Sequence, residues 1–294
     1  MRIAVLGPGG VGGFLAGALE RAGTPTWLLA REETAAVLSR LGLHVRSVLL
    51  DDAWTARPQV ATELRDAVDV LFVATKAVGL AEALDRVRAP VGLVVPLLNG
   101  LDHLPLLRER FPAVVAATIR ITADRPRPGV IEQTSPAVRV DLATEGQPDT
   151  AAVAAVVRGA GIPVHVGGTE AQVMWSKLVR LCALACTTAA SDLELGAIRD
   201  DPAWSARLDR ALAEGAAVAA ADGASVDPVA TRAELDAMPF GSTSSLQRDV
   251  RAGRPTELDA IAGAVLRAGE RHGLATPETA ALAELVAARV AAAG

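Results

Sequence analysis

The sequence lacks residue types that several enzyme classes require. It contains no tyrosine, which excludes a reductase whose proton comes from a Tyr-x-x-x-Lys pair. Its two cysteines, Cys182 and Cys186, and its four scattered histidines form no ligand cluster of the kind that a zinc dehydrogenase needs, so no metal site is expected. The cysteines lie four residues apart on an alanine-rich helical stretch, where two small core residues are a better interpretation than a redox pair.

A strong net charge and a membrane-spanning segment are absent as well. The formal net charge of −5 disfavours nucleic acid and anionic membranes as partners. No apolar run reaches 18 residues without a charge or a turn signal, and the N-terminal run meets its first glycine too soon for a signal peptide. With 294 residues, 51% of them hydrophobic, the chain is long and apolar enough for two folded domains. We expect a soluble, cytoplasmic protein.

The N-terminal 30 residues carry the clearest motif. A short apolar run at 2–6 is followed by a glycine-rich turn at 7–13, a helical pattern and a second apolar run at 26–30. In this strand–turn–helix–strand context, a GxGxxG motif indicates a dinucleotide-binding loop. The three glycines of the motif allow a tight turn, the approach of a pyrophosphate and close helix–strand packing. The expected dinucleotide-binding residues are Gly7, Gly9, Gly10, Val11 and Gly12.

The end of the second strand indicates which dinucleotide is bound. Arg31 is the first residue after that strand, and an arginine at this place can accept the 2′-phosphate of NADP. Glu32 and Glu33 follow directly, and an acid here would instead bond the 2′-hydroxyl of NAD. We therefore expect NADP, with NAD as the alternative.

Two rare residues follow later predicted strands. The chain has two lysines, Lys76 and Lys177, and one asparagine, Asn99. Lys76 follows a buried run at 68–74 and Asn99 follows another at 91–98, and ligands in open α/β sheets bind beyond the carboxyl ends of strands. Further strands are predicted at 114–121, 138–142 and 164–166.

From Gly167 onward strand patterns stop and long Ala/Leu-rich helical patterns begin. Helix starts are marked where an Asp or Thr precedes a first-turn proline, at Asp201-Pro202, Asp227-Pro228 and Thr276-Pro277, and Thr256 with Asp259 has the spacing of a capping box. The predicted fold is α/β: an N-terminal Rossmann-like, doubly wound parallel sheet over residues 1–167, followed by an all-α domain over 168–294.

These pieces together resemble the ketopantoate reductases (2-dehydropantoate 2-reductases) over the whole chain. The matching segments are GPGGVG at 7–12, TKA at 75–77, NG at 99–100, WSKL at 175–178 and SSLQRDVRAGRPTELD at 244–259, of which the last is the most specific. The resemblance implies an NADPH-dependent reductase of a small 2-keto acid, with a role in pantothenate biosynthesis.

The resemblance also implies roles for individual residues. Lys177 is similar to the family's general acid, and Glu257 to the residue that orients it. Ser245 resembles the residue that binds the substrate carboxylate. Asn99 and Lys76 resemble residues that contact cofactor and substrate, and Arg31 matches the basic residue for the 2′-phosphate.

The chemistry independently favours a lysine. Hydride addition to a ketone produces an alkoxide that must be protonated, and an ammonium can give up a proton whereas a guanidinium in a protein cannot. The reference lysine pKa of about 10.4 would have to fall for efficient transfer. Arg180, three residues after Lys177, would lower it and Glu257 would raise it, and the sequence does not rank the two effects.

The helix that carries Lys177 departs from the family pattern. Leu181 and Ala185 stand where the family usually has two asparagines that bond the substrate. We expect this wall of the substrate site to prefer an apolar or bulkier acyl group, unless Arg180 reaches in to hold a second anion.

Two other functions remain open on the sequence alone. A 3-hydroxyacid dehydrogenase of similar architecture also uses a lysine from a C-terminal helix, and a non-catalytic NADP-binding sensor would keep the glycine motif and Arg31. The long helical patterns at 258–272 and 277–293 could bury a homodimer interface or pack within their own domain.

Overall fold

The computed structural model describes residues 1–293, and their contacts divide the chain into two units. The sheet unit comprises Met1–Leu98 and His103–Val173, and the helical unit comprises Asn99–Asp102 and the chain from Met174 onward. The predicted boundary at 167/168 lies just before the long helix α6 (Glu170–Ser191), whereas the contacts divide the chain within the first turn of that helix. The assignment of residues 99–102 to the helical unit has no counterpart in the sequence pattern.

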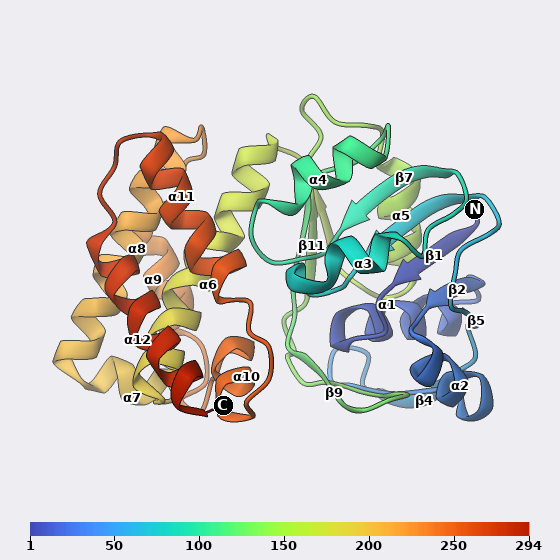
Figure 1. Cartoon of the computed structure of the whole chain (residues 1–294), viewed down its shortest axis with the longest axis horizontal. Coiled ribbons are helices and arrows are strands. Elements are labelled where there is room, and N and C mark those ends of the chain that lie inside the picture. Colours follow the sequence, from blue (N-terminus) through green and yellow to red (C-terminus); the bar gives the residue numbers. More distant parts are fainter. Residues whose placement is uncertain (294) are drawn as a thin grey trace. The chain divides into compact units, whose positions relative to one another are not determined.

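A parallel five-stranded sheet forms the centre of the sheet unit (Figure 1). Its strands in spatial order are β5 (Gln59–Ala61), β2 (Thr26–Leu29), β1 (Ile3–Leu6), β6 (Val68–Val73) and β7 (Val91–Pro96). All four residues of β1 are buried, because this strand is paired on both sides and carries only apolar side chains. The predicted strands at 2–6, 26–30, 68–74 and 91–98 are confirmed to within two residues at each end.

Helices connect the parallel strands, as parallel pairing requires. Helix α1 (Gly10–Arg21) joins β1 to β2, and α2 (Glu32–Leu41) begins after β2. A 3₁₀ turn, η1 (Ala77–Gly79), and the short helix α3 (Leu80–Leu84) join β6 to β7. These connections place the glycine turn, Arg31 and Lys76 after the carboxyl ends of β1, β2 and β6. The N-terminal half is therefore the doubly wound arrangement that the sequence predicted.

Two smaller sheets complete the unit. The first orders β4 (Asp52–Ala56), β3 (Leu43–Ser47), β10 (Val130–Gln133) and β9 (Ala123–Arg127), and the second orders β12 (Val164–Val166), β11 (Arg139–Leu142) and β8 (Ala117–Arg120). The strands of the first sheet, and β5 of the main sheet, were not predicted. They are short and partly exposed, so they lack the continuous apolar run of a buried parallel strand. Helix α4 (His103–Arg110) follows the loop after β7, and α5 (Ala151–Gly159) joins β11 to β12.

From Met174 onward all regular secondary structure of the described chain is helical, which confirms the predicted fold class (Figure 1). After α6 come α7 (Leu195–Asp200), α8 (Pro202–Ala221), α9 (Pro228–Asp236), α10 (Ser245–Arg251), one turn of π-helix η2 (Asp259–Gly263), α11 (Ala264–Arg271) and α12 (Pro277–Ala293). The three proline-marked helix starts are confirmed. The capping box of Thr256 and Asp259 is wrong, because the Asp259 carboxylate bonds Arg267 instead.

Helix α6 is the core element of the helical unit. Its length and composition would allow it to cross a membrane, but 72% of its most apolar window is buried in the protein, as in the core helix of a soluble fold. Trp175, in its second turn, is 1% exposed and donates its indole N–H to Asp222 at 2.7 Å. Burial alone would raise the pKa of Asp222, but hydrogen bonds with His272 and Trp175 hold it below its usual value.

Replacing Asp201 by alanine is expected to destabilise the helical unit. The Asp201 carboxylate accepts hydrogen bonds from the amides of Ala203 and Trp204 at 2.8 and 3.1 Å at the start of α8. Loss of such a cap lowers the free energy of unfolding by about 1 kcal/mol, whereas Asp201→Asn keeps an acceptor and most of the stability. Urea unfolding of both variants checks this, and equal losses in the two would contradict the capping role.

Candidate functional site

The glycine turn has the geometry of a dinucleotide-binding loop. Gly7 has a φ of +101°, a left-handed conformation that glycine adopts without strain. Gly12 lies so close to the turn that a Cβ there would be 2.1 Å from the Gly7 carbonyl oxygen. A Cβ on Gly10 would likewise be 2.1 Å from the carbonyl oxygen of Ala123. Any side chain at Gly10 or Gly12 would therefore displace backbone, and these two glycines are needed for packing.

The same turn is suited to an anionic group. Gly9 is the N-cap of α1 and has no side chain to bond the first amides, and the first turn of the helix holds no acid. Space above Gly9 is open, since a Cβ there would meet only the Ala74 carbonyl oxygen, at 4.0 Å. Nearby, the hydroxyl of Thr75 is buried and has no hydrogen-bond partner among the described residues. These features fit the pyrophosphate of a dinucleotide, which helix N-termini bind through free amides.

The two candidate basic residues of the sheet unit, Arg31 and Lys76, are exposed. Arg31 is the N-cap residue of α2, and its guanidinium forms an ion pair with Glu82 of α3 at 2.8 Å. Lys76 directly precedes η1 and is exposed. Val11 is partly buried in the first turn of α1. Each of these residues thus lies beside or just after the carboxyl end of a strand of the main sheet.

In the helical unit, the structure joins two of the predicted site residues directly. The side-chain amide of Asn99 donates a hydrogen bond to Glu257 Oε2 at 3.0 Å. The next residue, Gly100, has a φ of +84°, and a Cβ on it would lie 2.1 Å from the carbonyl oxygen of Ala260 in the π-turn. The loop 99–102 is therefore packed backbone-to-backbone against η2, a kind of helical irregularity that is frequent at functional sites.

Arg267 holds the far end of the same loop. Its guanidinium donates to Asp102 at 2.5 Å and to Asp259 at 2.7 Å. The hydrogen bond with Asp259 is the main cause that holds the pKa of Arg267 above its usual value, and the bond with Asp102 acts in the same direction. The loop 99–102 is thus attached to the segment 257–267 at both of its ends, through Asn99 and through Asp102.

Lys177 lies on α6 and is only 9% exposed. Leu181 and Ala185 follow one and two turns later, on the same side of the helix, and are partly and fully buried. Arg180 lies 3.6 Å from the Met238 sulfur and 3.9 Å from Glu234. The helix face that carries Lys177 is therefore apolar beyond the ammonium, and Arg180 is engaged with α9 and the residues after it.

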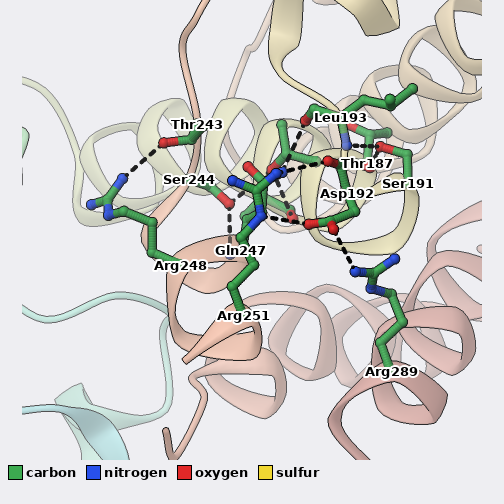
Figure 2. A network of polar contacts seen from close by, with 12 residues as sticks. Thr187, Ser191, Asp192, Leu193, Thr243, Ser244, Gln247, Arg248, Arg251 and Arg289 are labelled. Carbon is green, nitrogen blue, oxygen red and sulfur yellow. Dashed lines mark hydrogen bonds and ion pairs between the residues drawn. The ribbon is translucent and has the colours of Figure 1, made fainter. Parts of the chain in front are cut away.

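Ser245 is the exposed first residue of α10, and a polar network fixes the start of that helix against α6 (Figure 2). Ser244 caps α10 by accepting from the Gln247 amide at 3.0 Å, and its hydroxyl shares a 2.8 Å hydrogen bond with Thr188 of α6. The Gln247 side chain donates to the Leu193 carbonyl at 3.0 Å. The helix that carries Lys177 therefore also positions Ser245.

Asp192 ends this network after α6. It adopts a φ of +62° and forms ion pairs with Arg251 at 2.7 Å and Arg289 at 2.9 Å (Figure 2). Burial alone would raise the pKa of Asp192, but the two guanidiniums hold it below its usual value. Because Arg251 is the last residue of α10, both ends of this short helix are attached to the C-terminal end of α6.

The cysteines belong to the core of α6. Their sulfurs are 3.9 Å apart and both side chains are buried. The contact with Cys186 and burial raise the pKa of the Cys182 thiol well above its usual value, which makes it a poor nucleophile. Among residues 1–293, no three His, Cys, Asp or Glu side chains gather as a metal site would require.

The site residues found from the sequence have rare types or known motifs, whereas the residues that support them do not. Thr75 lies within the TKA segment, and its buried, unpartnered hydroxyl emerges only from the structure. The same is true of Thr188, which has no motif of its own, and of Arg267, one of many arginines in the chain.

Both parts of the chain match models of one family. Residues 3–144 match the model described as Ketopantoate reductase PanE/ApbA, and residues 171–290 match Ketopantoate reductase PanE/ApbA C terminal. The chain is 33% identical to a 2-dehydropantoate 2-reductase of Caulobacter vibrioides, with 97% of each chain covered. It is 31% identical to the enzyme of that name from Halobacterium salinarum, with 97% and 98% covered. A solved PanE/ApbA family ketopantoate reductase from Ralstonia eutropha has the same fold, with a TM-score of 0.87 and 24% identity over 100% of this chain and 99% of that one.

A pair of alanine substitutions tests the close packing of the Asn99 loop. Gly100→Ala and Gly223→Ala both place a Cβ on left-handed backbone, with φ of +84° and +88°, but nothing lies within 4 Å of the Cβ at Gly223. Gly100→Ala should therefore lower the free energy of unfolding by at least about 1 kcal/mol more than Gly223→Ala, because only the first crowds a backbone oxygen. Denaturant unfolding measures the difference, and equal losses would show that the loop is not packed on the π-turn.

Proposed function

The chain belongs to the ketopantoate reductase family, and on this premise we propose that it reduces a 2-keto acid with NADPH and that Lys177 is its general acid. Membership in the family makes the chain an NAD(P)-dependent oxidoreductase that acts on a keto group. The observation that carries the proposal for Lys177 is its burial: it is the only lysine of the helical unit, and it is 9% exposed on the core helix α6.

The proposed chemistry needs one proton. When bound, the dinucleotide supplies the hydride, and the carbonyl oxygen of the keto acid then develops negative charge. An ammonium held at that oxygen stabilises the charge and gives up its proton, which typically contributes about 10²–10⁴-fold to the rate. An arginine at the same place could only stabilise the charge, because its pKa is too high for it to release a proton.

Glu257, Asn99 and Ser245 have supporting roles in this proposal. The Asn99 amide fixes one oxygen of the Glu257 carboxylate through the 3.0 Å hydrogen bond. A carboxylate held in this way can orient the Lys177 ammonium or the substrate hydroxyl without rotating away. The Ser245 hydroxyl can donate a hydrogen bond to the carboxylate of the keto acid, and the Ser244–Thr188 bond keeps it in place relative to α6.

NADP rather than NAD is the proposed cofactor. The residues that would hold it are the glycines of the turn, with Thr75 beside the pyrophosphate, and Arg31 at the 2′-phosphate. The support for the phosphate role is the place of Arg31, which follows β2 directly at the N-terminus of α2. Lys76, exposed after β6, adds a second positive charge to the same edge of the sheet.

The two alternatives explain less of the structure. A 3-hydroxyacid dehydrogenase does not account for the match of both parts of the chain to ketopantoate reductase models. A sensor that only binds NADP would have no use for a buried ammonium on α6 or for the Asn99–Glu257 bond. A homodimer, built on α11 and α12, stays a prediction.

Substitution of Lys177 tests the general acid. Lys177→Ala should lower kcat by at least about 10²-fold while the affinity for NADPH changes little, because the ammonium acts on the carbonyl oxygen and not on the dinucleotide. Lys177→Arg should lose nearly as much, since it keeps the charge but has no proton to release at neutral pH. NADPH oxidation with a panel of 2-keto acids measures turnover, and NADPH fluorescence titration confirms that each variant is folded and binds.

Either of two results would count against the proposal. Full turnover by Lys177→Arg would show that charge alone suffices. NADPH binding by the wild-type chain without turnover of any 2-keto acid would favour the sensor.

Substitution of Leu181 tests the substrate class. If the apolar face beyond Lys177 contacts the acyl group, Leu181→Asn should raise kcat/KM for ketopantoate relative to a keto acid with an aliphatic side chain, because an amide can bond the substrate hydroxyl. Adding Ala185→Asn should extend the change, although Ala185 is fully buried and the double variant needs a thermal unfolding check. Leu285→Asn on α12, where the side chain is 41% exposed, is the control. An unchanged substrate ratio in Leu181→Asn would show that this wall does not set specificity.

A further inference from the structure

The proposed 2′-phosphate ligand is already engaged by an acid. Arg31 Nη2 lies 2.8 Å from Oε2 of Glu82 in α3, and the four strands β3 to β6 lie between these two residues in the sequence. The neighbouring residue Glu32 is paired in the opposite sense with Arg86, at 3.1 Å, and this contact holds the pKa of Glu32 below its usual value. Two adjacent ion pairs therefore connect the start of α2 to α3 and the segment after it. In one the cation lies on α2, and in the other the anion does.

Glu82 and a 2′-phosphate would require the same group. A phosphate that bonds the Arg31 guanidinium must either replace the Glu82 carboxylate or share the guanidinium with it. In the second case the phosphate and the carboxylate repel each other at short range. The ribose of NADH carries a neutral hydroxyl at this position, so its binding involves neither the exchange nor the repulsion. The contact consequently acts on one dinucleotide and not on the other.

We propose that Glu82 is a specificity residue that weakens the preference of this chain for NADPH over NADH by competing for Arg31. The inference rests on the proposed function, in which Arg31 binds the 2′-phosphate. Its size is limited by solvent, because the Arg31 and Glu82 side chains are 67% and 61% exposed. Exposed ion pairs of this kind change an equilibrium by a factor of about 2–5, and salt reduces the effect.

A double-mutant cycle on the full chain tests the competition. Dissociation constants for NADPH and NADH are measured by fluorescence titration for the wild type, Glu82→Gln, Arg31→Ala and the double variant, at low and at physiological salt. Glu82→Gln should bind NADPH about 2–5-fold more tightly at low salt and NADH unchanged within a factor of about 2. The gain should shrink with added salt and disappear when Arg31 is alanine.

A matched control separates competition from net charge. Glu109→Gln removes the same charge from an exposed residue of α4 that belongs to neither ion pair. Equal tightening of NADPH binding by Glu109→Gln and Glu82→Gln would overturn the inference, because a general change in charge would then explain both. The inference is equally overturned if Glu82→Gln leaves NADPH affinity unchanged or if its gain persists without Arg31.

The cycle also separates this inference from the function on which it rests. Arg31→Ala should weaken NADPH by at least about 10-fold and leave NADH nearly unchanged. If Arg31→Ala discriminates in this way but Glu82→Gln has no effect, only the role of Glu82 is wrong. If Arg31→Ala weakens the binding of both dinucleotides equally, Arg31 does not bind the 2′-phosphate and the inference about Glu82 fails with it. The proposal that Lys177 is the general acid is tested separately and is not affected.

Discussion

The hydrogen bond from Asn99 to Glu257 is the contact on which the candidate site depends most. It joins the loop 99–102 to the segment just before the π-turn, and both belong to the helical unit. Gly100 lets the backbones approach, and Arg267 holds the other end of the loop on Asp102 and Asp259. These contacts fix one oxygen of the Glu257 carboxylate and the backbone around it, and so hold this carboxylate in one position in the candidate site.

Helix α6 positions the other candidate residues of the site. It carries Lys177 in its first half, and Trp175 locks its second turn to Asp222. Thr188 and Asp192, at its end, hold the two ends of α10 and so the position of Ser245 (Figure 2). The same helix thus holds the Lys177 side chain by burial in its first half and holds α10 by hydrogen bonds and an ion pair at its end.

Much of this could be predicted from the sequence because the informative residues are rare or conformationally special. A glycine turn between two strands, an asparagine before a glycine and two lysines among many arginines are visible without a structure. The short strands β3, β4, β9 and β10 were not, since half-exposed alternation over four or five residues is a weak signal. Nor were Thr188, Arg267 and Glu82, because their roles depend on a partner far away in the chain. The capping box predicted for Thr256 and Asp259 is wrong, since spacing alone cannot tell which group an aspartate will bond.

The central claim is that the Lys177 ammonium meets the carbonyl oxygen of a 2-keto acid. The most direct measurement is a crystal structure of the chain with NADP⁺ and a non-reacting 2-keto acid analogue. Lys177 Nζ is expected within hydrogen-bond distance of the keto oxygen, about 2.7–3.1 Å, with Ser245 on the carboxylate. An analogue bound with its keto oxygen on another residue, and with Lys177 directed away from it, would contradict the claim.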